Sequence, residues 1–122
     1  MAAIAMAAMA ALLATVIVGL ASVGIVFAAR SQAVAAADAS ALAAAVASYP
    51  PAGSGAPARV AASIAGANGA TLVSCSCPAN SLLEKRVVTV IVAIPLEVPI
   101  LGTLSIRAGS RAEFDPGRWL GR

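Results

Sequence analysis

The stretch from Leu12 to Phe27 reads LLATVIVGLASVGIVF. It is the densest part of a longer run, Met1 to Ala29, that contains no charged side chain. At 1.5 Å per residue a helix over this run is roughly 43 Å long, whereas the hydrocarbon core of a bilayer is about 30 Å thick. Residues 1–29 therefore predict a transmembrane helix.

A cleaved secretory signal is the main alternative, because the small residues near Val26 to Ala29 fit a peptidase site. No basic n-region precedes the apolar run, and the run is longer than a usual h-region. Both features favour a retained single-pass anchor. The flanking charge Arg30 follows the run, and cytoplasmic flanks usually carry Lys and Arg, so this rule alone would place the remaining chain in the cytosol.

The composition argues against an enzyme and against a nucleic-acid-binding protein. Of 122 residues, 61% are hydrophobic, but 33 are alanine and only 3% are aromatic, so a large core is hard to build. The absence of histidine removes the commonest general base and metal ligand. The net charge is +3, yet the eight basic residues are scattered, and the five carboxylates form no pair. We expect no catalytic residues, cofactor, metal, nucleic acid or small-molecule substrate.

Beyond Arg30 the chain predicts an α+β fold. Residues 30–48 contain no Gly or Pro and continue the helix as a rod, and the Pro- and Gly-rich residues 49–57 form a loop. Residues 58–114 form a small head with a short helix and three antiparallel strands. We expect the helix at 58–67 and the strands at 71–74, 86–94 and 103–114, with Pro95 and Pro99 closing the central strand and 115–122 as a flexible tail.

Two patterns lie on the long helix. At about 100° per residue, Val34, Leu42, Val46 and Tyr49 share one arc, which we expect to pack against the head. Asp38 lies in the same arc, either simply solvated or in contact with another subunit. A second face carries small residues, which let membrane helices approach closely, although an Ala-rich helix shows such faces by chance. This small face comprises Ala10, Ala14, Ala21, Gly24 and Ala28.

Cys75 and Cys77 form a C-x-C motif, and on a strand both thiols would point to the same side. Zinc needs about four ligands, which two cysteines without histidine cannot supply. A separation of two residues is unfavourable for a direct bridge. A disulfide to another chain, two free thiols and an incidental role all remain open.

The sequence at the junction between anchor and rod resembles that of a known protein family. Residues 29–45 read ARSQAVAAADASALAAA and resemble the R-x-Q-x-A-A-D-x-A-A-L-A-A-A signature of TadE/TadG-like proteins. Arg30 and Gln32 lie two residues further from Asp38 than in that pattern, and Ser40 replaces an alanine. Residues 60–75, VAASIAGANGATLVSC, resemble a segment of the helicase/secretion-neighbourhood TadE-like branch, and residues 86–94 and 103–112 are similar to its closing strands.

This resemblance implies a minor pseudopilin-like component of a tight-adherence (Flp-type) pilus or a related secretion apparatus. Such a protein is anchored in the cytoplasmic membrane with its head outside and acts by assembly. Its partners are the lipid bilayer and other pilin-like subunits, and the candidate subunit contacts are Asp38, Arg30, Ala14, Ala21, Gly24 and Ala28. Two other functions stay open: a secreted or envelope-bound interaction module with a cleaved signal, and a small regulatory membrane subunit with a cytosolic tail.

Overall fold

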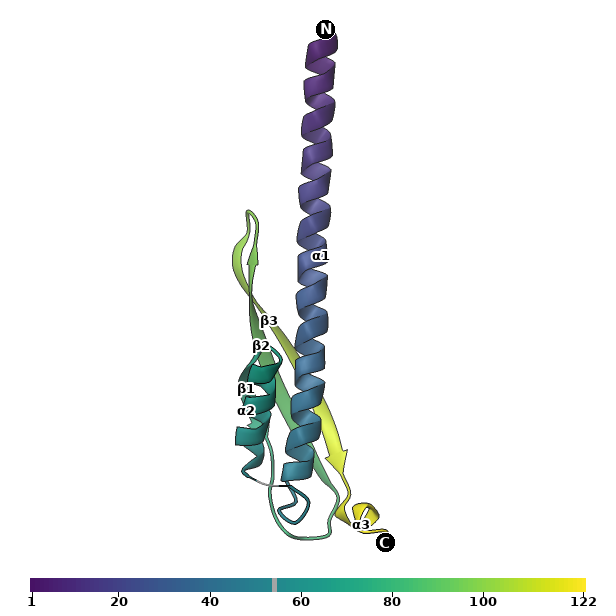
Figure 1. Ribbon diagram of the computed structural model, residues 1–122, viewed down its shortest axis with the longest axis vertical. Coiled ribbons are helices and arrows are strands. Elements are labelled where there is room, and N and C mark those ends of the chain that lie inside the picture. Colours follow the sequence, from purple (N-terminus) through teal and green to yellow (C-terminus); the bar gives the residue numbers. More distant parts are fainter. Residues whose placement is uncertain (54) are drawn as a thin grey trace.

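One long helix and a small α+β head make up the protein (Figure 1). The computed structural model describes residues 1–53 and 55–122, so residue 54 of the predicted 49–57 loop lies outside the described residues. The predicted α+β architecture, with a long apolar helix, a short second helix and a three-stranded antiparallel sheet, is confirmed. In chain order the elements are α1 (Ala2–Ala47), α2 (Pro57–Ala67), β1 (Thr71–Ser76), β2 (Arg86–Val98), β3 (Gly102–Phe114) and α3 (Pro116–Trp119).

The sheet has the strand order β1-β2-β3, and both pairs of neighbours are antiparallel. The expectation that Pro95 ends the central strand is wrong, because β2 runs on to Val98 and pairs with β3 over its whole length. β1 accompanies β2 only as far as Ala93. At Pro95 the strand therefore has a free edge, where a residue without an N–H group is tolerated.

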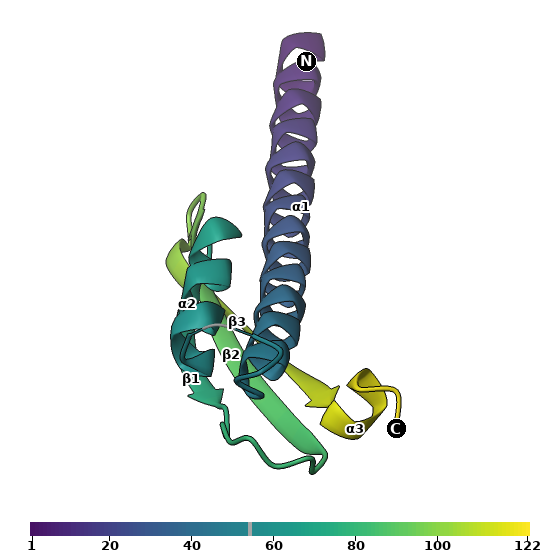
Figure 2. The same cartoon turned by 60° about the horizontal axis from the view of Figure 1, so that its bottom comes forward.

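Both α1 and α2 lie on one face of the sheet, α1 against β2 and β3 and α2 against α1 and β1 (Figures 1 and 2). Alternate residues of β2 are buried, with Val88, Val90 and Val92 fully so. The core that they form with the helices consists otherwise mostly of alanine. The alanines of the core are Ala33, Ala36, Ala37, Ala41, Ala44, Ala45, Ala61, Ala65, Ala70, Ala108 and Ala112.

The predicted packing stripe on α1 is therefore wrong. Val34, Leu42 and Val46 are 41%, 64% and 41% exposed, and only Tyr49 of that arc is buried. Alanine side chains face the sheet instead, because small residues let the helix backbone approach closely and the valines of β2 supply the volume. Larger residues on α1 are left on its outer sides.

Local signals explain where the shorter elements begin and end. Pro57 opens α2, and the Asn68 side-chain amide donates to the Ile64 carbonyl at 2.8 Å where the helix ends. Gly69 follows with a φ of +73°, which lets the chain reverse into β1. Gly53 lies against the end of α1, where an added methyl group would come within 2.8 Å of the Ala47 Cα.

The flexible tail expected over residues 115–122 is replaced by the short helix α3. The Asp115 carboxylate accepts a hydrogen bond from the Arg118 amide at 3.2 Å and so caps the turn, which Pro116 begins. The Trp119 ring lies 6.2 Å from the ring of Tyr49, edge to face. Aromatic contact with the end of α1 therefore holds the C-terminal turn against the head.

Candidate functional site

The N-terminal part of α1 is largely uncovered within the described chain. No residue of the helix before Ala29 is buried, and its most apolar window is fully uncovered. The helix is long and apolar enough to cross a membrane. The buried residues of α1 all lie in its C-terminal part, and before them only the β2–β3 hairpin of the described head lies beside the apolar helix (Figure 1).

Gly24 and Ala28 of the small face lie on the side of α1 that points away from the head, whereas Ala14 lines a groove beside the turn of the β2–β3 hairpin. Ala28 is nine residues from the fully buried Ala37, and at about 100° per residue this separation is half a turn around the helix. Gly24 and Ala28 are each eighteen residues, or about five turns, from Leu42 and Val46. The two exposed apolar side chains Leu42 and Val46 thus continue the line of Gly24 and Ala28 along the rod, and we call Gly24, Ala28, Leu42 and Val46 the outer stripe.

Of the two charged candidates, Asp38 lies one turn before Leu42 and about 40° around the helix from it, whereas Arg30 lies apart from this line. Asp38 is exposed on the rod, and it makes no ion pair with any residue in the described part of the chain. Arg30 is exposed at the junction of anchor and rod, where it lines a groove between α1 and the head. The structure does not bring Arg30 and Asp38 together with the small face into one cluster.

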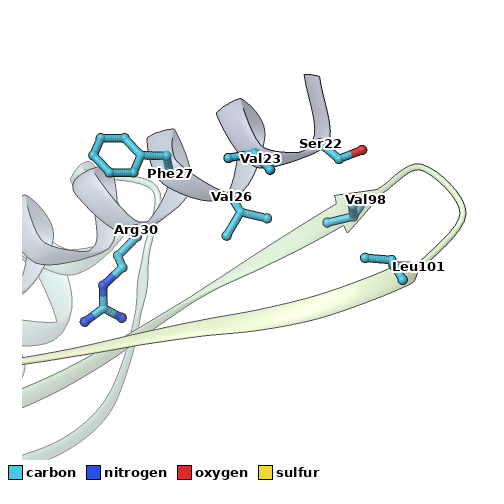
Figure 3. Close-up of a pocket in the computed structure, with 7 residues that line it drawn as sticks. All are labelled: Ser22, Val23, Val26, Phe27, Arg30, Val98 and Leu101. Atoms are coloured by element: carbon cyan, nitrogen blue, oxygen red, sulfur yellow. The ribbon is translucent and has the colours of Figure 1, made fainter. Parts of the chain in front are cut away.

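A groove runs between α1 and the hairpin of β2 and β3. It has a volume of about 310 Å³ and is lined by Ser22, Val23, Val26, Phe27, Arg30, Val98 and Leu101. Figure 3 shows Val98 and Leu101 at the hairpin end facing Val26 of the helix, with Arg30 at the end of the groove away from the turn. A second groove, of about 600 Å³, continues between the turn residues 99–101 and helix residues from Ala11 to Ser22. The hairpin therefore reaches alongside the apolar part of α1.

A buried arginine joins the end of the rod to the head. Arg86 is 6% exposed, and its Nη1 donates to the carbonyl oxygens of Ser48 at 2.8 Å and Asn80 at 2.6 Å. Its other nitrogens donate to the carbonyls of Leu82 and Glu84, and its guanidinium lies 5.6 Å from the centre of the Tyr49 ring. A cation at the C-terminal end of α1 also interacts favourably with the helix dipole.

Sequence reasoning missed Arg86 and the hairpin tip, for different reasons. The partners of Arg86 are main-chain carbonyls, for which no residue pattern codes. The tip did carry a signal, since Ile100 and Leu101 are large and apolar, whereas turns are normally built from Gly, Pro, Asn, Asp and Ser.

Contrary to the expectation from their spacing, the two cysteines are bonded to each other. Cys75, at the end of β1, forms a disulfide with Cys77, and the two Cα atoms lie 5.4 Å apart. Both side chains are partly buried and pack against the alanine core. The bridge is formed within the chain, so in this arrangement neither thiol is available for a partner.

Over residues 1–53 and 55–122, no group of three or more His, Cys, Asp or Glu side chains could hold a metal ion. What the described structure offers for interaction is three exposed apolar surfaces: the outer stripe, the N-terminal part of α1 and the hairpin tip. No family model, curated protein or solved structure matches this chain.

Proposed function

We propose that this protein is a membrane-anchored, minor pseudopilin-like component of a tight-adherence pilus or a related secretion apparatus, and that it acts by assembly. One observation carries the proposal: a single continuous helix of 46 residues packs under the head at one end and is uncovered at the other. An apolar helix of this length needs a bilayer or other helices around it. The resemblance of residues 29–45 and 60–75 to TadE-like proteins supports the same function.

The head lies outside the cytoplasmic membrane in this proposal. A disulfide such as Cys75–Cys77 persists in oxidising compartments and is rare in the cytosol. The positive-inside rule, applied to Arg30 alone, favours the opposite orientation. We give the disulfide more weight, because one charge is weak evidence and a reduced cytosol would not keep the bridge.

The outer stripe is the surface through which neighbouring subunits pack. Small side chains at Gly24 and Ala28 let a second helix approach closely within the membrane. Outside it, Leu42 is 64% exposed and Val46 41%, so a neighbour would bury apolar area at both positions. Asp38, exposed and without an ion-pair partner in the described structure, is available to a cation of that neighbour.

Cysteine cross-linking in membranes tests the proposal. Cys75 and Cys77 are first replaced by Ser, and a single cysteine is then introduced by Gly24→Cys or, as the matched control, by Val23→Cys. The control site lies at the same depth but about 100° around the helix. After mild oxidation of membranes from cells that make the protein, we expect Gly24→Cys to give dimers or larger products and Val23→Cys to stay monomeric. Equal cross-linking of both variants, or of neither, would contradict assembly through this stripe.

A further inference from the structure

The turn between β2 and β3 presents apolar side chains to the outside. Its residues Pro99, Ile100 and Leu101 follow Val98 directly, with no polar residue among the four. Ile100 is 92% exposed and Leu101 is 69% exposed. We call residues 98–101 the hairpin tip. Neither the head nor α1 covers its two outermost side chains.

The backbone conformation at the tip is unfavourable for the residue that adopts it. Ile100 has a φ of +76°, a conformation in which Gly or Asn is usual and a β-branched residue is an outlier. The head gains no contact from this side chain in return, because the side chain is almost fully exposed. An unfavourable backbone conformation that keeps a large apolar side chain exposed to solvent indicates that this side chain contacts something outside the head.

The position of the tip along α1 indicates what that contact is. The two grooves place the tip beside helix residues from Ala11 to Phe27, within the uncharged run that ends at Ala29. In Figures 1 and 2 the hairpin extends from the head along the bare part of the helix. If α1 crosses a bilayer, the tip therefore meets the surface of that bilayer or its interior.

Polar groups next to the tip limit its depth. Glu97 and Thr103 form the last cross-strand pair but one before the turn, and both are exposed. A carboxylate and open strand edges are not tolerated in the hydrocarbon core. About 20 residues suffice to cross that core, so the crossing can be made by residues close to the N-terminus of α1, with Val23 to Phe27 at the headgroup level.

We infer that the hairpin tip inserts into the interfacial layer of the same bilayer that α1 crosses, as a second contact with phospholipid. The exposed side chains of Ile100 and Leu101 enter the boundary between headgroups and acyl chains, while Glu97 and Thr103 remain in water. Two contacts, α1 and the tip, fix both the depth of the helix and the tilt of the head against the membrane. The inference rests on α1 lying in a bilayer and does not require assembly into a filament.

Tryptophan quenching in phosphatidylcholine vesicles tests this contact with the full chain. In a Trp119→Phe background, a single tryptophan is introduced by Ile100→Trp at the tip. Arg111→Trp, at an exposed site of β3 away from the turn, is the matched control, and Leu13→Trp reports insertion of α1. Emission is measured with acrylamide in water and with lipids brominated at shallow acyl positions for the tip or at deep acyl positions for Leu13→Trp. Circular dichroism checks that each variant keeps its fold.

We expect brominated lipid to quench Ile100→Trp and Leu13→Trp strongly, and Arg111→Trp to be quenched only by acrylamide. Emission of Ile100→Trp should also be blue-shifted relative to Arg111→Trp. Quenching of Leu13→Trp by lipid but of Ile100→Trp by acrylamide alone would overturn the inference and leave the anchored protein standing. A tip tryptophan shielded from both quenchers would overturn it in favour of a second copy that covers the tip. If Leu13→Trp also escapes brominated lipid, the inference and the membrane anchor both fail.

Discussion

Replacing Arg86 by Met is expected to loosen the attachment of the head to the rod. The change removes the hydrogen bonds of a 6% exposed guanidinium to four main-chain carbonyls and its contact with the Tyr49 ring. The Ser48 carbonyl would keep only the longer hydrogen bond that it accepts from the Asn80 amide, at 3.2 Å. The end of α1 would then be tied to the loop before β2 by that one hydrogen bond.

The expected loss of stability is estimated from the two shortest hydrogen bonds of Nη1, those to the carbonyls of Ser48 and Asn80. A hydrogen bond from a charged donor contributes about 1.5–3 kcal/mol net. Part of this loss in the free energy of unfolding is offset, because the apolar side chain of Met avoids the desolvation cost of a buried charge. We expect unfolding to become easier by about 2–4 kcal/mol in total. In a domain of this size that loss lowers the melting temperature by roughly 10–25 °C.

Thermal unfolding of the full chain in detergent micelles, followed by Trp119 fluorescence, measures the effect. Trp119 contacts Tyr49, so its emission reports on the same end of the head. Arg111→Met is the control, since it also removes one positive charge but from an exposed position. Arg86→Lys should recover only a small part of the loss, because an ammonium group cannot reproduce the planar fork of donors. If Arg86→Met melts no earlier than Arg111→Met, the reasoning is refuted.

Three further changes are checked by the same melting experiment. Ser40→Ala should stabilise the fold by about 1 kcal/mol, because the Ser40 hydroxyl is fully buried and has no hydrogen-bond partner in the described structure; a lower melting temperature would contradict this. Ala41→Leu should cost about 1–3 kcal/mol or more by overpacking the contact of α1 with the head, whereas the exposed Ala35→Leu should be neutral; similar effects of both would show that the alanine core is not tightly packed. Gly53→Ala should destabilise through its clash with the helix backbone, whereas Gly66→Ala, inside α2 with open space around it, should stabilise by about 0.5–1 kcal/mol; a shift of the same sign in both would refute this contrast.

The elements with strong local signals were predictable from the sequence. The uncharged run and the alanines before Ser48 indicated one long helix, and Pro57 with Asn68-Gly69 marked both ends of α2. The runs of Val and Ile indicated the strands. The extension of β2 past Pro95 could not be predicted, because it depends on where β1 stops pairing, which is a property of the assembled sheet.

The packing of α1 was mispredicted because the larger apolar side chains of this helix are not the buried ones. Leu42 and Val46 are the larger apolar residues of the rod, yet alanines such as Ala37 and Ala44 form the contact with the sheet. Residue hydrophobicity alone does not say which face can approach most closely. The small face was visible from spacing, but the position of Gly24 and Ala28 opposite the head, which makes them available to a neighbour, came only from the fold.

The most direct test of the central claim is labelling of the head cysteines in intact cells. A membrane-impermeant reductant opens the Cys75–Cys77 bridge, a membrane-impermeant maleimide labels the thiols, and the membrane pellet is separated from the supernatant. A variant with both cysteines replaced by Ser controls for background. The account predicts labelled, full-length protein in the membrane pellet of intact cells. Labelled protein in the supernatant with a shortened N-terminus, or labelling in the pellet only after lysis, would contradict it.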